Sequence, residues 1–222
     1  MTPDPNETAL VVDEPAGNGA PGSGEPVPPD VPPRSGSNSR WLREGLLVVL
    51  VAVLVAVLLR TFVVQTFYIP SGSMEPTLQV GDRILVNKLS YHLHAVSRGD
   101  IVVFSRPAAE NCGGPEVNDL VKRVIGLPGD TVTLAGGHVY IDGRKLDESW
   151  LPASEQGHTQ PGPPGNSANL QQAFTVPAND YYVMGDNRTD SCDSRYWGPI
   201  PRSLIVGKVE MRVWPVTSIR FF

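Results

Sequence analysis

One long apolar run stands apart from the rest of the chain. It extends from Leu46 to Leu59 without a polar residue and, after two polar residues, continues to Val64. At about 1.5 Å per residue this run makes a helix of roughly 28 Å, close to the hydrocarbon thickness of a bilayer. It is apolar on all sides, unlike an amphipathic core helix, and it begins too far from the N-terminus for a secretory signal. We therefore predict a single transmembrane helix over residues 42–64.

Beyond residue 70, short apolar stretches alternate with turn residues such as Gly, Pro, Asn and Asp. No segment there keeps a helical period over ten or more residues, and short strands at this spacing are typical of an antiparallel sandwich or barrel. We therefore predict an all-β domain over residues 65–222, an antiparallel sheet or barrel tethered by the one N-terminal helix, with a surface excursion at residues 144–171. The expected strands are 83–87, 100–104, 120–125, 131–134, 138–141, 172–176, 181–184 and 205–214.

Composition separates the N-terminal segment from the folded part. Residues 1–40 hold nine of the 22 prolines, five glycines and six acidic residues. Such a segment has too few apolar side chains to offset the cost of ordering, so we predict a disordered tail. The tail carries −4 of the chain's net charge of −5, which leaves −1 for residues 41–222. A nearly neutral domain argues against nucleic acid as the partner, because phosphate binding needs clustered basic charge.

Basic residues set the orientation of the predicted span. Arg34, Arg40 and Arg43 precede its apolar run, whereas the next basic residue after Arg60 is Arg83. The positive-inside rule places the tail in the cytoplasm and the β domain outside. Any chemistry of that domain is then extracytoplasmic.

Metal binding finds little support in the sequence. Cys112 and Cys192 lie in no CxxC or His/Cys ligand spacing. A calcium loop beginning at Asp186 needs glycine at its sixth position and glutamate at its twelfth, where the chain has Ser191 and Trp197. We expect neither a metal nor a cofactor.

Residues 69–78, between the span and the first strand, contain two serines, a glycine and two prolines. The four histidines are scattered, so the remaining base for a serine nucleophile is a lysine kept neutral by burial. Lys122 lies inside an apolar strand, where it and Arg123 point to opposite faces. Each feature alone also has an ordinary interpretation, as a loop and as an edge-strand lysine that prevents aggregation.

Four segments in order resemble the conserved boxes of bacterial type I signal peptidases. They are residues 71–77 around Ser73, the run 81–88, the run 122–130 and the run 185–195, and they follow a membrane span. The resemblance covers the chain from about residue 41 to 215 and does not include the tail. It implies a membrane-anchored serine endopeptidase with a Ser–Lys dyad that removes signal peptides from exported preproteins.

The resemblance also implies roles for individual residues. Ser73 matches the nucleophile and Lys122 the general base. Ser71 matches the hydroxyl that joins the Ser73 N–H in the oxyanion hole, Ser191 the serine that orients the lysine amine, and Asp193 a supporting aspartate. The remaining implied residues are Arg123, Asp186 and Arg195 in supporting ion pairs, and Phe67, Ile69, Met74, Leu78 and Val121 in a pocket for small side chains at substrate positions −1 and −3.

The two cysteines lie in a compartment where disulfides persist, if the predicted topology holds. If Ser191 contacts Lys122, the loop that leads into the lysine strand has a short path to Cys192. We therefore expect a Cys112–Cys192 disulfide, with a free loop thiol and a small packed cysteine as the alternative.

The expected partners are the signal peptides of preproteins and the lipid bilayer, and not nucleic acid. The expected location is the bacterial cell membrane, with a single pass and a cytoplasmic N-terminus. A second hypothesis is a membrane-tethered β module that binds a partner without catalysis. That module would have no need for a lysine in the interior of a strand.

Overall fold

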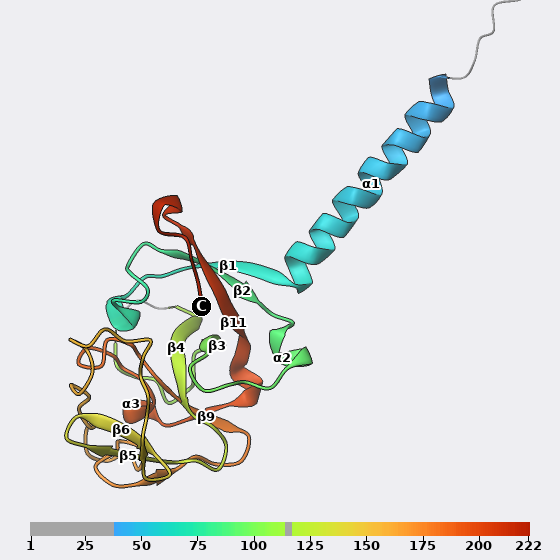
Figure 1. The fold of residues 1–222 in the computed structure, drawn as a ribbon. Helices are drawn as coiled ribbons and strands as arrows, with labels where there is room; N and C mark the ends of the chain where they lie inside the picture. Colours follow the sequence, from blue (N-terminus) through green and yellow to red (C-terminus); the bar gives the residue numbers. More distant parts are fainter. Residues whose placement is uncertain (1–37, 114–116) are drawn as a thin grey trace, which may run out of the picture. The chain divides into compact units, whose positions relative to one another are not determined.

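The structure, a computed structural model, describes residues 38–113 and 117–222. Helix α1 covers Asn38–Phe62 (Figure 1). The predicted tail lies outside the described residues except for its last three, which begin α1. Among the helices of the described chain, none combines the length and the apolar character needed to cross a membrane. The helix also ends before Val64, because Val64 pairs with Asn87 as the first residue of strand β1.

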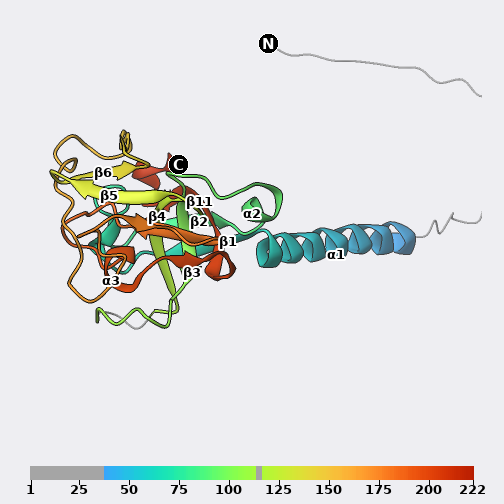
Figure 2. The same ribbon diagram turned by 90° about the horizontal axis from the view of Figure 1, so that it is seen from below.

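The described residues after α1 form two antiparallel sheets (Figures 1 and 2). The larger has the order β1-β2-β11-β3-β4-β9-β10, with β12 paired to β11, and the smaller has the order β7-β6-β5-β8. The all-β antiparallel prediction is confirmed. The strands are β1 Val64–Tyr68, β2 Arg83–Asn87, β3 Ile101–Ser105, β4 Asp119–Gly126, β5 Thr131–Ala135, β6 His138–Ile141, β7 Arg144–Lys145, β8 Phe174–Thr175, β9 Asp180–Met184, β10 Ile200–Pro201, β11 Ile205–Trp214 and β12 Arg220–Phe221. The short helices are η1 Gly72–Met74, α2 Ser90–Leu93, α3 Ser194–Trp197, η2 Arg202–Leu204 and η3 Val216–Ser218.

All eight predicted strands are present, some with ends shifted by one or two residues. Strands β1, β7, β10 and β12 were not predicted from the sequence. Strand β1 directly follows the apolar run, so hydrophobicity alone could not separate the two. The other three have two residues each, too few for an alternating pattern.

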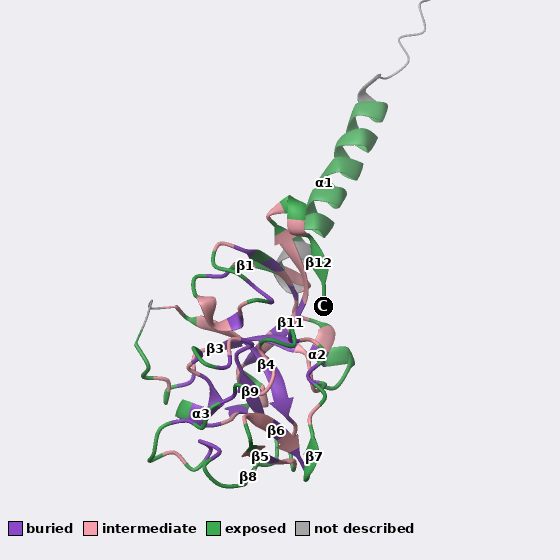
Figure 3. Cartoon of the chain, turned by 60° about the vertical axis from the view of Figure 1, so that its left-hand side comes forward, coloured by how far each residue is buried: buried purple, intermediate pink, exposed green. Residues whose placement is uncertain are grey.

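Strand β4 lies between β3 and β9 in the larger sheet. Its first three residues are partly exposed and the last five are buried. Buried residues gather in β3, β4 and β9 (Figure 3). A core cluster that includes Ile69, Met74 and Val103 connects this sheet to η1. The strand therefore carries its polar residues into the packed interior of the domain.

The prediction that residues 144–171 form a surface excursion is wrong for part of the segment. Glu148, Thr159 and Ala168 are buried, and the Ala168 carbonyl accepts a 2.6 Å hydrogen bond from the Tyr182 hydroxyl. Such a segment is held by hydrogen bonds between side chains and backbone, which leave no periodic pattern in the sequence.

Candidate active site

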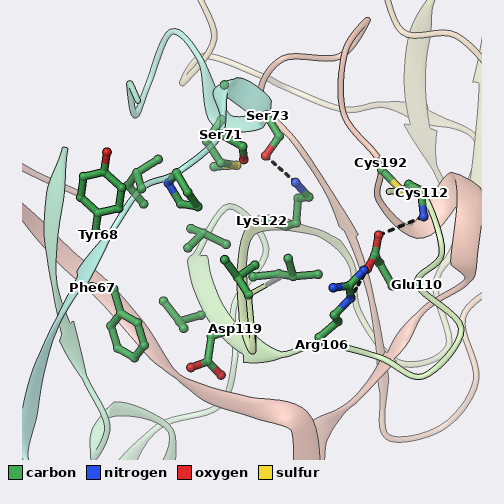
Figure 4. A pocket seen from close by; sticks show the side chains of 18 of the residues that line it. Phe67, Tyr68, Ser71, Ser73, Arg106, Glu110, Cys112, Asp119, Lys122 and Cys192 are labelled. Carbon is green, nitrogen blue, oxygen red and sulfur yellow. Dashed lines mark hydrogen bonds and ion pairs between the residues drawn. A yellow bond between two sulfur atoms is a disulfide. The ribbon is translucent and has the colours of Figure 1, made fainter. Parts of the chain in front are cut away.

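Ser73 and Lys122 meet although they come from separate elements. Ser73 lies in η1, and Lys122 lies on β4 opposite Val102 of β3. The Nζ of Lys122 lies 2.6 Å from the Ser73 Oγ, within hydrogen-bonding distance (Figure 4). The lysine is 4% exposed, so a strand interior delivers a buried amine to a serine hydroxyl.

The turn around Ser73 is fixed by its neighbours. The backbone N–H of Glu75 donates to the Gly72 carbonyl at 3.0 Å, and that of Leu78 donates to the Met74 carbonyl at 2.9 Å. Met74 is buried in the core cluster with Ile69. Because the residue after Ser73 is anchored in the core, the serine side chain is held at the edge of a cavity lined by residues of η1, β1 and β4.

Burial changes the protonation of Lys122. Loss of water around the amine is the main cause that lowers its pKa from 10.5 to about 8, while the negative charge of Asp193 opposes this shift. A lysine with a pKa near 8 is neutral in about one molecule in ten at pH 7, and in that form it can accept a proton. None of the described residues that line the cavity is a histidine. Lys122 is therefore the candidate general base.

Two buried ion pairs support the site. Arg123 holds both carboxylate oxygens of Asp186 at 2.8 and 2.6 Å. Arg195 holds both oxygens of Asp193 at 2.8 and 2.7 Å. Bidentate pairs of this kind fix geometry as well as charge. The three residues expected in ion pairs and the expected supporting aspartate, Asp193, therefore form two separate pairs.

Asp193 also connects its ion pair with Arg195 to the backbone. One of its oxygens accepts the Gly185 N–H at 3.0 Å, and its side chain caps the start of α3 at Arg195. Burial alone would raise the pKa of Asp193, but the charge and hydrogen bonds of Arg195 hold this pKa below its usual value. Asp193 is therefore an anion that fixes the loop 185–195.

Ser191 and Ser71 have fewer contacts than the resemblance implies. Ser191 is buried, and its Oγ has no hydrogen-bond partner among the described residues. The expected hydrogen bond between the Ser191 hydroxyl and the Lys122 amine is therefore not formed in this structure. Ser71 is exposed, lines the cavity and makes no capping bond to η1.

Gly185 is packed tightly against the same serine. A Cβ at Gly185 would collide with both the Ser191 Oγ and the Ser73 carbonyl oxygen. Ser191 therefore lies close to the backbone of Ser73.

A cavity of about 320 Å³ opens beside the dyad. Four of the five predicted pocket residues line it, and the fifth, Leu78, does not. Leu78 is fully buried in the core cluster with Ile69 and Met74, because the turn after Ser73 directs it inward. The predicted residues that line the cavity are Phe67, Ile69, Met74 and Val121.

Part of the cavity wall is charged, which was not predicted from the sequence. Arg106 forms an ion pair with Glu110, and Glu110 accepts the backbone N–H of Cys112 at 3.1 Å. Cys112 forms a disulfide with Cys192, with the two Cα atoms 6.3 Å apart (Figure 4). The bridge connects the loop after β3 to the residue next to Ser191. Charged loop residues without a motif gave no signal for this wall.

Among the described residues, one group of side chains has metal-ligand spacing: Glu110, Cys112 and Cys192. The disulfide uses both sulfur atoms. The group therefore offers a metal only the carboxylate of Glu110, which already pairs with Arg106.

Comparison with known proteins agrees with the chemistry of this site. Residues 42–214 match the family described as signal peptidase, peptidase S26. The chain is 42% identical to signal peptidase I of Leptolyngbya laminosa, over 80% of this chain and 82% of that protein. It is 42% identical to probable signal peptidase I-2 of Synechocystis sp., over 81% and 76% of the two chains. It is 38% identical to signal peptidase I of Bacillus caldolyticus, over 77% and 91%. The chain belongs to the signal peptidase family, peptidase S26.

Proposed function

We propose that this protein removes the signal peptides of exported preproteins as a serine endopeptidase, with Ser73 as nucleophile and Lys122 as general base. Its family membership supports the reaction. The observation that carries the assignment of the residues is the 2.6 Å distance between the Ser73 Oγ and the buried Lys122 Nζ at the edge of the cavity.

In the acylation step, the neutral amine of Lys122 takes the proton of the Ser73 hydroxyl as the oxygen attacks the scissile carbonyl carbon. The negative charge that develops on the carbonyl oxygen is stabilised by the Ser73 N–H and the Ser71 hydroxyl. The ammonium of Lys122 then gives its proton to the leaving amine, and the C–N bond breaks. The products are the free mature protein and an acyl-enzyme on Ser73.

Deacylation repeats the same proton transfers with water. Lys122, neutral again, takes a proton from a water molecule that attacks the ester carbon. The amine then returns the proton to the Ser73 oxygen as the ester bond breaks. The signal peptide leaves as a carboxylic acid that releases its proton to water, and the enzyme regains its starting protonation.

The pocket supports selection of small side chains next to the cut. Phe67, Ile69, Met74 and Val121 supply apolar walls, and the two residues nearest the dyad in sequence are Met74 and Val121. An apolar wall this close to the nucleophile leaves room for small side chains at positions −1 and −3. We propose that alanine is favoured at both positions.

We further propose that residues 42–64 anchor the protein in the bacterial cell membrane, with the N-terminus in the cytoplasm. The proposal rests on the apolar run and on the distribution of arginines. The described large apolar side chains of α1 between Leu46 and Val57 are exposed, as expected of a surface that faces lipid. The β domain adds exposed apolar residues near its C-terminus: Trp214, Val216, Ile219 and Phe221.

The test is cleavage of a peptide that contains Ala-x-Ala by the purified full chain in detergent. We expect cleavage after the second alanine, and loss of cleavage in both Ser73→Ala and Lys122→Ala. Matched controls are Ser154→Ala and Lys145→Ala, because both side chains are exposed and outside the cavity. A Lys122→Ala enzyme that cuts at the rate of its control would refute the dyad.

A further inference from the structure

Asn187 makes direct contact with the turn that carries Ser73. Its backbone N–H donates to the Ser73 carbonyl at 3.1 Å. Its side-chain Nδ2 donates to the Gly72 carbonyl at 3.2 Å. One residue therefore holds two consecutive carbonyl groups of η1, although 113 residues or more separate it from that turn in sequence.

The side-chain amide of Asn187 is held at its other end too. Its Oδ1 accepts the backbone N–H of Asp190 at 3.2 Å and the hydroxyl of Thr189 at 3.4 Å. The acceptor end thus faces its own loop and the donor end faces η1. An aspartate at this position could still accept hydrogen bonds from Thr189 and Asp190, but it could not donate one to the Gly72 carbonyl.

The two neighbours of Asn187 are buried and fixed. Asp186 is held by two nitrogens, Nε and Nη2, of its bidentate partner Arg123, the residue after Lys122 on β4. On the other side, Arg188 is 1% exposed, donates to the Gly185 carbonyl at 3.0 Å and pairs with Glu148. The backbone of Asn187 is therefore anchored to the strand of the candidate base.

We propose that Asn187 is a positioning residue, which holds the turn 72–74 so that the Ser73 hydroxyl stays within reach of the Lys122 amine. The proposal rests on the roles proposed above for Ser73 and Lys122. Asn187 acts through the backbone of η1, so its loss should slow acylation. It should not change the burial of Lys122 or the pocket walls that β1 and β4 supply.

The test compares Asn187→Ala with Asn118→Ala in the full chain, using the Ala-x-Ala peptide above and below the pKa of Lys122. Asn118 is exposed and does not line the cavity. We expect kcat of Asn187→Ala to fall about 10- to 100-fold, the cost of a misplaced reacting group. KM should stay within about twofold of wild type, and the acidic limb of the pH profile should not move, because Lys122 stays buried.

Ser73→Ala separates this proposal from the proposed function. If Ser73→Ala keeps its activity, the dyad assignment fails, whatever Asn187→Ala does. If Ser73→Ala is inactive and Asn187→Ala matches Asn118→Ala, the positioning role of Asn187 is wrong and the dyad stands.

Two further results would overturn the proposal. One is a shift of the acidic limb in Asn187→Ala, which would mean that the base and not the turn was disturbed. The other is a lower kcat of Asn187→Ala together with a lower thermal unfolding midpoint, which would mean that the variant is destabilised as a whole. If Asn187→Ala does not fold, Asn187→Asp replaces it, because the aspartate keeps the acceptor contacts to Asp190 and Thr189. A folded Asn187→Asp with normal kcat above the pKa of Lys122, or failure of both variants to fold, overturns the positioning role.

Discussion

Lys122 is buried at a position where its charged form is costly. Removal of the amine from water lowers its pKa to about 8, and Asp193 only partly offsets this effect. The same burial that makes the amine a base therefore makes the charged amine unfavourable to the fold. Function and stability oppose each other at this residue.

Replacement of Lys122 by methionine should stabilise the protein and abolish its activity. The pKa is about 8 in the folded state against an ordinary 10.5. Below pH 8 the fold carries a buried ammonium, and this cost disappears as the pH rises from 8 to 10.5. We expect Lys122→Met to raise the free energy of unfolding at pH 7 by about 1–3 kcal/mol. Urea denaturation at pH 7 and pH 10.5 measures it, and a gain that does not shrink at the higher pH contradicts the explanation.

Replacement of Gly185 by alanine should lower the activity, because the added methyl group would clash with Ser73 and Ser191. The added Cβ meets the Ser191 Oγ and the Ser73 carbonyl, neither of which is the end of a long flexible side chain. We expect a loss of about 1–3 kcal/mol in stability and of at least about 100-fold in kcat. Gly45→Ala is the control, because nothing lies within 4 Å of its Cβ position. Wild-type kcat in Gly185→Ala would show that the close packing of Gly185 against Ser73 and Ser191 is not needed.

At the scale of elements, the loop 185–195 is held by two other segments of the chain. The loop after β3 is bridged by Cys112 to Cys192 in the loop 185–195, and the segment 144–171 packs behind that loop. Asn166 donates to the carbonyl groups of Ser194 and Arg195 at 3.4 and 3.3 Å. These contacts explain why a long segment that has regular structure only in β7, at its start, is partly buried.

The sequence predicted the elements that have a period and the residues that lie in a motif. Strand β4 was predicted from its apolar run. Lys122 was chosen as a candidate because it is a charged residue inside that run. The contact between Asn187 and η1 was not, because hydrogen bonds between loops leave no spacing rule. Leu78 was expected in the pocket because the family resemblance places apolar residues that flank the nucleophile there. It does not line the cavity, since distance along the chain from Ser73 does not tell which way a turn directs a side chain.

The disulfide should be present in protein made outside the cytoplasm. We expect no alkylation of the folded protein without reductant, and two alkylated thiols after reduction. The bridge closes a separation of 80 residues, for which loop entropy gives a stabilisation of about 4–5 kcal/mol. Mass spectrometry after alkylation counts the free thiols. Urea denaturation of the Cys112→Ser/Cys192→Ser variant, compared with wild type, measures the stabilisation. Two modified thiols in the unreduced protein would rule the bridge out.

At the scale of the whole molecule, the proposed anchor brings the enzyme to its substrate. Nine residues separate Val64 from Ser73, and an extended chain covers at most about 3.6 Å per residue. Ser73 can therefore lie no more than about 32 Å from Val64. A preprotein held in the bilayer by its signal peptide would present its cleavage site within that range.

The topology can be tested by adding protease to cells whose outer layers have been made permeable while the cytoplasmic membrane stays closed. We expect digestion of the chain beyond residue 70 and protection of the tail, because the proposed orientation puts the tail on the cytoplasmic side. An epitope at each end of the chain distinguishes the fragments by size. Protection of the catalytic domain until the cells are lysed would overturn the proposed orientation.

Acylation of the protein by an activated ester, followed by mass spectrometry across pH, tests the Ser73–Lys122 dyad most directly. We expect one acyl group on Ser73, at a rate that rises with pH through an apparent pKa near 8, the value for buried Lys122. Lys122→Ala should lose most of this rate and its pH dependence near 8. Acylation of another residue, or a Lys122→Ala protein labelled on Ser73 at the wild-type rate, would show that the dyad is wrong.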